Sequence, residues 1–407
     1  MRPVALQLVQ AISAAGGRAL MVGGAVRDAL LGKTPKDLDI EVYGLPAEKL
    51  EAVIATVAPY DTVGKSFGVY KLKNYPIDLS LPRRESKVGA GHKGFEVIGD
   101  PHMSFPEACA RRDFTVNAIL WDIATDEIID PFNGRSDLQK KLLRHTSPHF
   151  VEDPLRVLRA MQFAARFQFD VAPKTVEMCA QITPENLPAE RLFEEWKKLL
   201  LKGVQPSLGL HFLRACGWTK YYPELHALIG CQQDPEWHPE GDVWIHTLHC
   251  LDAFARERVG ENFSEAGGSR GSPLGGASGG AAPTNNIPLP AGGGKGVGVD
   301  SAWENLVVGF AVLLHDIGKP PTTQFIEGHW RSRGHDTAGV PIAEKFLRRL
   351  TNETALIDQV LPLVECHMRP LDLFKTQASD AAIRRLARKV GRIDRLVRVS
   401  HADMQGR

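Results

Sequence analysis

The amino-acid sequence predicts an α+β domain followed by a region that is almost wholly helical. Over residues 1–145, short β-type runs alternate with Gly and Pro punctuation, as in RALMVGG, LDIEVYG, GVYKLK, IDLSL, VNAILWD and EIIDPF. From Asp153 onward, apolar residues recur three or four positions apart, as in PLRVLRAMQFAARF and RLFEEWKKLLL, which is typical of amphipathic helices. We therefore expect a mixed sheet with helices first and all-α structure after it.

Composition narrows the class of protein. With 407 residues, of which 43% are hydrophobic and 24% charged, the chain can form two or three domains. A net charge of +1 argues against a protein that coats nucleic acid indiscriminately. The six cysteines include no CxxC pair, so neither a disulfide framework nor a zinc knuckle is indicated. No segment resembles a signal peptide or a membrane span, and we expect a cytoplasmic protein without membrane contact.

A Gly-rich segment interrupts the helical region at about residues 260–300. Its sequence, GSRGSPLGGASGGAAPTNNIPLPAGGGKGVG, has no hydrophobic period and consists mainly of Gly, Ala, Pro and Ser. Such a composition is typical of flexible linkers. We expect an insertion that loops out of one domain without dividing it.

A Gly-Gly turn near the amino terminus is the first candidate for binding. The segment GGAVRD, from Gly23 to Asp28, follows the apolar run ALMV and precedes the helical ALLG. At a strand-to-helix turn, free backbone N–H groups and the helix dipole favour an anion. Most Gly-Gly turns only reverse the chain, so this one gains significance only from the residues downstream of it.

Closely spaced aspartates come next, in PKDLDIEV. Alternate residues of a strand share a face, so Asp37 and Asp39 should point together. Such carboxylates repel each other unless a cation lies between them, and their oxygen atoms suit Mg²⁺. A pair of Mg²⁺ ions could activate a hydroxyl and stabilise departing pyrophosphate. The alternative, solvated aspartates at a strand edge, is disfavoured by the phosphate-type turn just upstream.

At this point the sequence resembles a known family. GGAVRDALLGKTPKDLDIEV is similar to the signature of class II tRNA nucleotidyltransferases and bacterial poly(A) polymerases, within the polymerase-beta-like superfamily. Further segments resemble, in order, the family's ribose and phosphate motif, hinge motif, base-reading motif and neck-closing motif: ARRDFTVNAI, DPFNGRSDLQKKLLR, EDPLRVLRAMQFAARF and AERLFEEWKKLL. The resemblance implies a nucleotidyltransferase head over residues 1–145 and a helical neck and body over residues 146–225, which bind the nucleotide base and tRNA.

The resemblance implies roles for individual residues. Asp37 and Asp39 would hold Mg²⁺ at the catalytic site, and Asp78 in IDLSLPRR is the candidate for a third carboxylate on a neighbouring strand. The residues expected to bind the nucleotide are Gly23, Gly24, Arg27, Arg83, Arg111, Arg112, Asp113, Asn117, Asp153, Arg156 and Arg159. Arg27 and Arg83 could donate charge-assisted hydrogen bonds to a triphosphate, and surface salt bridges are the alternative.

Asp153 and Arg156 are candidates for choosing the base. Pro154 suits a first helical position and Asp153 the cap before it, which explains Asp153 without function. Arg156, one turn on, would place a guanidinium beside that carboxylate. Cytosine and adenine present an amino donor next to a ring acceptor, so such a pair would accept them and leave uracil or guanine with unpaired polar groups. The resemblance implies this role, whereas Arg159 and Arg166 would support the helix or contact RNA.

The region over residues 226–407 carries a second candidate site. Its histidines and aspartates resemble the ligand set of the HD phosphohydrolase superfamily: His246, His315, Asp316 and Asp403. A lone His on an apolar helix such as FAVLLHDIGKPP is usually a core residue. Imidazole and carboxylate ligands together suit a divalent metal, for which Mg²⁺, Mn²⁺ and Ni²⁺ stay open, and metal-bound water would attack a phosphate ester. His335 and His367 could add ligands or bind phosphate.

The resemblance implies a CCA-adding enzyme that takes tRNA, CTP and ATP and also has phosphatase, 2′-nucleotidase or 2′,3′-cyclic phosphodiesterase activity. Alternatives are a poly(A) polymerase or an enzyme that adds only part of the CCA end, and an HD phosphohydrolase whose polymerase-like part only binds RNA. Residues 84–110 are long enough for the mobile loop expected of full CCA addition. The chain departs from the family in the long separation of His246 from His315 and in ending four residues after Asp403. A monomer and a homodimer both stay open.

Overall fold

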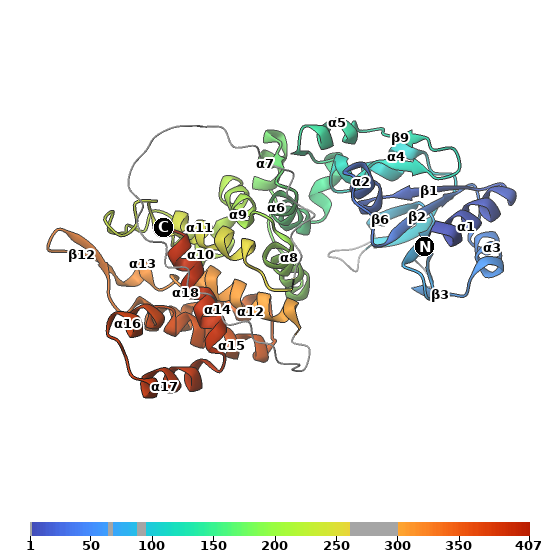
Figure 1. Ribbon diagram of the computed structural model, residues 1–407. Coiled ribbons are helices and arrows are strands. Elements are labelled where there is room, and N and C mark those ends of the chain that lie inside the picture. The colour runs from blue at the N-terminus through green and yellow to red at the C-terminus, as the bar shows by residue number, and fades with distance from the viewer. Residues whose placement is uncertain (1, 64–67, 88–94, 261–299) are drawn as a thin grey trace, which may run out of the picture.

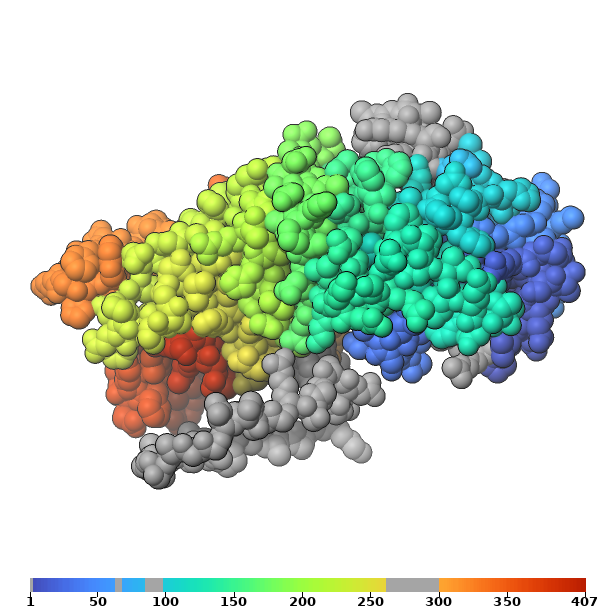
Figure 2. All heavy atoms as spheres, turned by 90° about the horizontal axis from the view of Figure 1, so that it is seen from above, coloured from blue at the N-terminus to red at the C-terminus, as the bar shows by residue number. Residues whose placement is uncertain are grey.

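The computed structural model describes residues 2–63, 68–87, 95–260 and 300–407. An elongated molecule results, with the amino-terminal head at one end and the helices of the carboxy-terminal region at the other (Figure 1). The view from above shows the same order, with the neck between them (Figure 2). The expected Gly-rich insertion falls on residues 261–299, and part of the expected mobile loop on residues 88–94, so both lie outside the described residues.

The head contains a mixed sheet with the strand order β3-β4-β5-β2-β1-β8-β9. Its strands are β1 (Arg18–Val22), β2 (Leu38–Tyr43), β3 (Tyr60–Val63), β4 (Val69–Leu72), β5 (Ile77–Ser80), β8 (Leu120–Asp122) and β9 (Ile128–Ile129). All neighbours are antiparallel except β2 and β5, which are parallel. Every β-type run expected from the sequence contains one of these strands. A separate hairpin is formed by β6 (Arg83–Lys87) and β7 (Phe95–Gly99).

Helices cover the sheet and connect its strands. In the head these are α1 (Arg2–Ala14), α2 (Gly24–Leu30), α3 (Ala47–Val57), α4 (Phe105–Ala110), the 3₁₀ turn η1 (Thr115–Asn117) and α5 (Gly134–Gln139). Apolar residues of α1 and α3 pack in one core with Ile40 and Val42 of β2. Because side chains alternate along a strand, this packing places Asp39 and Glu41 on the opposite face of β2.

The neck and the carboxy-terminal region are mainly helical. The neck comprises β10 (Leu142–Leu143), η2 (Pro148–Glu152), α6 (Leu155–Phe167), β11 (Asp170–Val171), α7 (Pro173–Ala180), α8 (Ala189–Lys202), α9 (Pro206–Ala215), η3 (Trp218–Tyr221) and α10 (Pro223–His226). The remaining helices are α11 (Val243–Arg256), α12 (Ser301–Leu314), α13 (Lys319–Thr322), α14 (His335–Leu350), α15 (Thr354–Cys366), α16 (Arg369–Lys375), α17 (Asp380–Val390) and α18 (Ile393–Gln405). Among the described residues, no helix combines the length and the apolar character that crossing a bilayer requires.

The region that was expected to be almost wholly helical is mainly helical, and an antiparallel hairpin within it was not predicted. There β12 (Thr323–Ile326) pairs with β13 (His329–Ser332), and the hairpin projects from the helices in Figure 1. Glu327 and Gly328 connect the strands with φ angles of 51° and 82°. Positive φ at both central residues is the requirement of a tight hairpin turn, and a Gly at the second position was the sequence signal for it.

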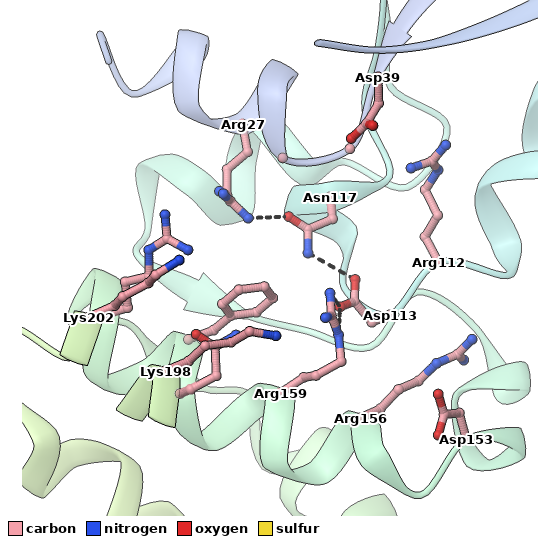
Figure 3. A pocket seen from close by; sticks show the side chains of 15 residues that line it. Arg27, Asp39, Arg112, Asp113, Asn117, Asp153, Arg156, Arg159, Lys198 and Lys202 are labelled. Carbon is pink, nitrogen blue, oxygen red and sulfur yellow. Dashed lines mark hydrogen bonds and ion pairs between the residues drawn. The ribbon is translucent and has the colours of Figure 1, made fainter. Parts of the chain in front are cut away.

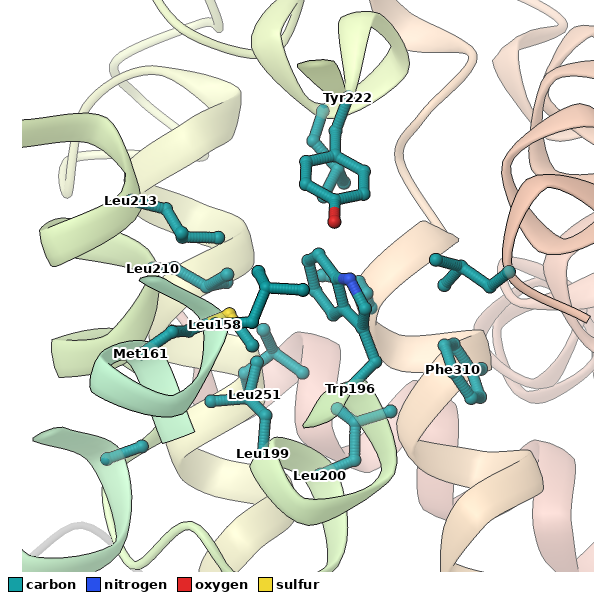
Figure 4. Packing of buried hydrophobic residues seen from close by; sticks show 14 of the residues in the cluster. Leu158, Met161, Trp196, Leu199, Leu200, Leu210, Leu213, Tyr222, Leu251 and Phe310 are labelled. Carbon is teal, nitrogen blue, oxygen red and sulfur yellow. The ribbon is translucent and has the colours of Figure 1, made fainter. Parts of the chain in front are cut away.

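A continuous apolar core joins the neck to both ends of the molecule. It contains Met21 of the head, the buried faces of α6, α8 and α9, and the interior of the carboxy-terminal helices as far as Ala402. Trp196 lies at its centre, surrounded by apolar side chains from several helices (Figure 4). Its ring meets Tyr222 edge-on at a centroid distance of 5.1 Å and Phe346 at 5.5 Å.

We predict that Trp196→Ala lowers the free energy of unfolding by about 3 to 5 kcal/mol, because a fully buried indole leaves a cavity that the neighbouring helices cannot fill. Chemical denaturation followed by far-UV circular dichroism measures the change. Trp237→Ala is the matched control, because that indole is 60% exposed and its loss should cost no more than about 0.5 kcal/mol. Equal losses in the two variants would contradict a core centred on Trp196.

Candidate active sites

The Gly-Gly turn connects β1 to α2, as the sequence predicted. Gly23 has φ 69°, a conformation that side chains other than glycine rarely adopt. A Cβ atom at Gly23 would lie 3.2 Å from Nη1 of Arg112 and 3.9 Å from Oδ2 of Asp39. The turn therefore lies directly against a cation and a carboxylate, with its backbone open to a small ligand between them.

Carboxylates gather beside this turn on β2 and β5. The parallel register sets Asp39 directly opposite Asp78, which confirms that Asp78 lies on a neighbouring strand. Asp37 precedes β2 by one residue, so the expectation that both aspartates lie within the strand is wrong for Asp37. Desolvation raises the pKa of Asp39, and so do the negative charges of Asp78, Asp37 and Glu41, while Arg112 opposes them. The negative charges are thus close enough to act on one another.

Glu41 is a functional candidate that the sequence reasoning missed. It lies two residues after Asp39, and the alternation of the strand was the available signal. Its Oε1 accepts a hydrogen bond from Nη2 of Arg112 at 2.6 Å, and its Oε2 accepts one from the hydroxyl of Tyr43 at 3.0 Å. These contacts hold the guanidinium of Arg112 beside Gly23.

The donor set of the head fits Mg²⁺. Among the residues that the structure describes there, no three ligand atoms of His, Cys, Asp or Glu side chains lie within 4.8 Å of one another. Mg²⁺ usually takes one or two carboxylates and completes its shell with water and substrate phosphates. Asp39 with Asp37 or Asp78 supplies carboxylates of this kind, and the mutual repulsion expressed in the pKa of Asp39 would be relieved by a cation.

A cavity of about 510 Å³ opens between the head and the neck (Figure 3). Of the predicted residues, its walls include Gly23, Gly24, Arg27, Asp39, Arg112, Asp113, Asn117, Asp153, Arg156 and Arg159. Residues that the sequence reasoning did not assign to nucleotide binding also line it, namely Gln162, Phe163, Arg166, Lys198 and Lys202. Lys198 and Lys202 lie one turn apart on α8, a spacing that was visible in the sequence.

The remaining predicted residues lie outside the walls of this cavity. They are Asp37, Asp78, Arg83 and Arg111. Arg83 begins β6 and lies opposite Gly99, so the structure does not place it in the pocket. Arg111 ends α4, and its carbonyl accepts a hydrogen bond from Nη2 of Arg156 at 2.6 Å.

A hydrogen-bonded chain crosses the pocket from head to neck. Nη1 of Arg27 donates to Oδ1 of Asn117 at 2.7 Å, and Nδ2 of Asn117 donates to Oδ1 of Asp113 at 2.9 Å. Oδ2 of Asp113 accepts from Nε of Arg159 at 2.7 Å. Burial alone would raise the pKa of Asp113, but the charge of Arg159 and the hydrogen bonds hold it below its usual value.

Arg27 has a buried position in this chain. Its guanidinium carbon lies 4.4 Å from the centre of the Phe167 ring, and Nη2 donates to Asp28 at 2.7 Å. The side chain is 4% exposed, so a surface salt bridge does not describe it. Arg27 therefore contacts both the head and the aromatic side of α6.

Asp153 and Arg156 lie at the same end of the pocket (Figure 3). Oδ1 of Asp153 accepts from the backbone N–H of Leu155 at 3.0 Å, a contact of the capping kind that was expected, although α6 begins at Leu155, one residue later than predicted. Oδ2 accepts from Nη2 of Arg191 on α8 at 2.8 Å, a partner that the sequence reasoning missed. Nη1 of Arg156 donates to the carbonyl of His149 at 2.7 Å. These contacts fix both side chains.

The second site gathers histidines and aspartates from three helices and two turns. Nε2 of His246 on α11 lies 3.1 Å from Oδ1 of Asp403 on α18 and 3.4 Å from Nε2 of His315. Nε2 of His315 lies 3.2 Å from Oδ2 of Asp316. All four side chains are buried. His315 and Asp316 lie one and two residues beyond the last residue of α12, so the expectation that they lie within the helix is wrong by that distance.

His335 and His367 join this site. Oδ1 of Asp316 lies 3.3 Å from Nε2 of His335 and 3.8 Å from Nε2 of His367. His335 begins α14, and His367 follows α15. Gly318 permits this arrangement, because a Cβ there would overlap the carbonyl oxygen of His335. The two oxygens of Asp316 thus face different pairs of histidines.

Each of these imidazoles is oriented through its other nitrogen. Nδ1 of His315 lies 2.8 Å from the carbonyl of Val312, and the equivalent atoms of His335 and His367 lie 2.8 and 2.7 Å from backbone carbonyls. Nδ1 of His246 lies 2.7 Å from Oε1 of Glu240, which also contacts His238. When the imidazole is neutral, as a metal ligand must be, donating a hydrogen bond from Nδ1 leaves Nε2 unprotonated and free to bind the metal.

This second donor set fits a divalent metal. The ligand atoms of His246, Cys250, His315 and Asp403 lie within 4.8 Å of one another, as do those of Asp316, His335 and His367. Asp316 and Cys250 raise the pKa of His315 to about 10 despite its burial, whereas burial and the charge of His315 lower the pKa of His367 to about 4. Buried imidazole and carboxylate groups facing one point suit such an ion.

Family models match three segments of the chain. A family model described as a poly A polymerase head domain matches residues 19–144. A model described as a probable RNA and SrmB-binding site of polymerase A matches residues 168–229, and an HD domain model matches residues 302–399.

Similar proteins cover nearly the whole chain. A multifunctional CCA protein of Shewanella denitrificans is 34% identical over 400 residues, which is 95% of this chain and 84% of that protein. A CCA-adding enzyme of Bacillus stearothermophilus solved with CTP has a TM-score of 0.60 at 22% identity over 98% of this chain and 76% of that chain. One of Thermotoga maritima has a TM-score of 0.58 at 18% identity, over 98% and 78% of the two chains. The chain therefore belongs to the family of CCA-adding tRNA nucleotidyltransferases and bacterial poly(A) polymerases, with a carboxy-terminal HD domain.

Proposed function

We propose that the chain adds C, C and A in sequence, without a template strand, to the 3′ end of tRNA, using CTP and ATP. The observation that carries this proposal is one cavity lined by Asp39, by the turn at Gly23, and by Asp153 with Arg156. A site for phosphate and metal chemistry thus adjoins groups that can form hydrogen bonds with a base. Membership of the family supports the same activity.

The proposed transfer is a direct displacement at phosphorus. The 3′ oxygen of the RNA bonds to the α-phosphorus of the nucleotide, the bond from that phosphorus to pyrophosphate breaks, and the hydroxyl proton leaves to solvent. Asp37, Asp39 and Asp78 would hold Mg²⁺, which when bound stabilises charge on the attacking and leaving oxygens. Arg112, held by Glu41 beside Gly23, is placed to neutralise the phosphates.

Asp153 and Arg156 would choose the base. Cytosine and adenine both offer an amino donor to a carboxylate and a ring-nitrogen acceptor to a guanidinium, whereas uracil and guanine offer the reverse. The contacts of Asp153 with Arg191 and the start of α6 would restrict its movement. A wrong base would leave polar groups unpaired at about 1 to 3 kcal/mol each.

We further propose that the HD domain hydrolyses phosphate esters at RNA ends, as a phosphatase, 2′-nucleotidase or 2′,3′-cyclic phosphodiesterase. The support is the pair of ligand groups that meet at Asp316. Mg²⁺, Mn²⁺ or Ni²⁺ bound there would supply an activated water. We place the head at residues 1–145, the neck and body at 146–225 and the HD domain at 226–407, and the three matched segments support these bounds.

The alternatives differ in chemistry or in class. A poly(A) polymerase or a partial enzyme would use the same carboxylates but add A tracts or an incomplete end. An HD phosphohydrolase with a merely RNA-binding head would not need Asp39 and Asp78 in register beside a Gly turn. Offering tRNA without its 3′ end together with Mg²⁺ and CTP, ATP or both separates these alternatives, because only the proposed function gives ordered C, C, A addition.

We predict that Asp39→Ala lowers the rate of nucleotide addition by about 100- to 10,000-fold, because the site loses a metal ligand and with it stabilisation of the transferring phosphoryl group. Extension of 3′-truncated tRNA under single-turnover conditions measures the loss. The matched control is Asp61→Ala, an exposed aspartate on the same sheet that pairs with Lys73 and should leave the rate unchanged. Equal rates for the Asp39 variant and the parent chain would refute the proposed catalytic site.

We predict that Asp153→Asn reduces discrimination between CTP and UTP by about 5- to 150-fold, because the amide can present a donor where only an acceptor stood. The kcat/KM values for the four nucleoside triphosphates measure this effect. Asp170→Asn is the control, since Asp170 is an exposed aspartate of the neck outside the walls of the pocket. If both variants discriminate as the parent chain does, Asp153 does not choose the base.

We predict that His315→Ala abolishes hydrolysis of 2′,3′-cyclic phosphate ends but leaves C and A addition intact, because the two sites use separate residues. Phosphate release and tRNA extension are measured on the same preparation. His401→Ala is the control, because His401 lies on α18 with Asp403 but is exposed and pairs with Glu257. Loss of both activities in the His315 variant would instead indicate a general folding defect.

A further inference from the structure

The HD site opens into a cavity of about 450 Å³ whose outer wall carries two indole rings. Asp316, His335 and Asp403 form the inner wall, and Trp237 and Trp330 belong to the same cavity. The aromatic rings and the candidate metal ligands therefore face one space. Neither tryptophan is required by the proposed hydrolysis.

Trp237 has no role in the apolar core. Its side chain is 60% exposed, although tryptophan is the residue with most to gain from burial. Its neighbour His238 contacts Glu240, the residue that also orients the ligand candidate His246. The exposed indole is thereby attached to the framework of the metal site, which favours a binding role over chance exposure.

Trp330 faces the cavity from the β12–β13 hairpin. Its ring packs against Phe325 of the paired strand at a centroid distance of 5.1 Å. An ion pair of 2.7 Å between His329 and Asp234 ties this hairpin to the loop that carries Trp237. The segments that carry Trp237 and Trp330 are therefore linked to each other, and the segment that carries Trp237 is also linked to the metal site.

Cations complete the cavity. Lys319 lies 2.7 Å from Oδ2 of Asp316, and Lys375 and Arg407 also line the space. Lys319 beside Asp316, and Arg407 at 3.5 Å from Asp403, suit a phosphate, and the planar aromatic rings suit a nucleobase, because every base has a face that stacks on an aromatic ring. Arranged in this order, they match a nucleotide with its phosphate directed inward.

We propose that Trp237 and Trp330 form a stacking platform for the terminal base of an RNA whose 2′,3′-cyclic or 2′ phosphate lies at Asp316. In the cyclic case, the oxygen of water bonds to phosphorus, one phosphorus–ribose oxygen bond breaks, and the proton passes to the released ribose oxygen. The platform selects nucleotides over small phosphate esters and tolerates any base, because stacking reads no hydrogen-bond pattern. This inference rests on the proposed hydrolase activity.

The test compares a substrate that has a base with one that lacks it. Trp237→Ala and Trp330→Ala should each raise KM for adenosine 2′,3′-cyclic phosphate by about 5- to 100-fold, with little change in kcat. Their KM for glycerol 1,2-cyclic phosphate should stay unchanged. Trp237→Phe should restore most of the lost affinity, because phenylalanine still stacks. Phe374→Ala is the control, an aromatic residue of the same domain that is 71% exposed outside this cavity.

A binding measurement separates failure of the platform from failure of the hydrolase. Titration of the full chain with adenosine 2′-monophosphate should quench tryptophan fluorescence, and the quenching should decrease in both alanine variants. If the parent chain hydrolyses neither substrate, the proposed hydrolase fails, yet the titration still tests the platform. Equal effects of the variants on both substrates, or unaltered quenching, would overturn the platform and assign these indoles to another partner such as a protein.

Discussion

The ion pair between the buried carboxylate of Asp113 in the head and the partly buried guanidinium of Arg159 on α6 is the interaction on which the nucleotide pocket depends. Taking the charge of Asp113 out of water is costly, and only good geometry and further hydrogen bonds offset that cost. Asp113 has these, since it also accepts from Asn117 and the backbone N–H of Phe114. Through Asn117 the connection reaches Arg27 beside the Gly-Gly turn. The head and the neck are therefore joined at the point where a substrate would have to touch both.

The HD site depends on a different constraint, the hydrogen bond made by each imidazole at Nδ1. Backbone carbonyls hold His315, His335 and His367, so their orientation follows directly from the ends of the helices that carry them. His246 lies inside α11, where the backbone carbonyls already accept hydrogen bonds within the helix. The side chain of Glu240 therefore accepts the hydrogen bond from Nδ1 of His246. Asp316 then faces all four rings because the absence of a side chain at Gly318 lets α14 approach. Ligand geometry here is thus a consequence of helix packing.

The two sites would recognise the same RNA end by different physics. In the head–neck pocket, Asp153 and Arg156 would test the hydrogen-bond pattern of an incoming base, which discriminates strongly because a wrong base leaves buried groups unpaired. At the HD cavity, Trp237 and Trp330 would stack on whatever base ends the RNA. Selectivity for the base suits nucleotide addition, which builds a defined sequence. Tolerance of any base suits phosphate hydrolysis, which would act on whatever nucleotide ends the RNA. One continuous core, with Trp196 at its centre, supports both.

The sequence by itself determined what depends on neighbours along the chain: the turn at Gly23, the alternation that presents Asp39 away from the core, and the cap formed by Asp153. It also determined six of the seven strands of the head sheet, all except β3, because strand periodicity is local. Only the tertiary structure decided which side chains pair across the fold. Glu41 holds Arg112, and Arg191 donates a hydrogen bond to Asp153. Asp316 faces His335 and His367 as well as His246. Such partners lie tens of residues or more apart, and no local period records which elements will pack together. The β12–β13 hairpin escaped prediction because its short strands lie between strongly helical segments, whose pattern outweighed the Glu-Gly turn.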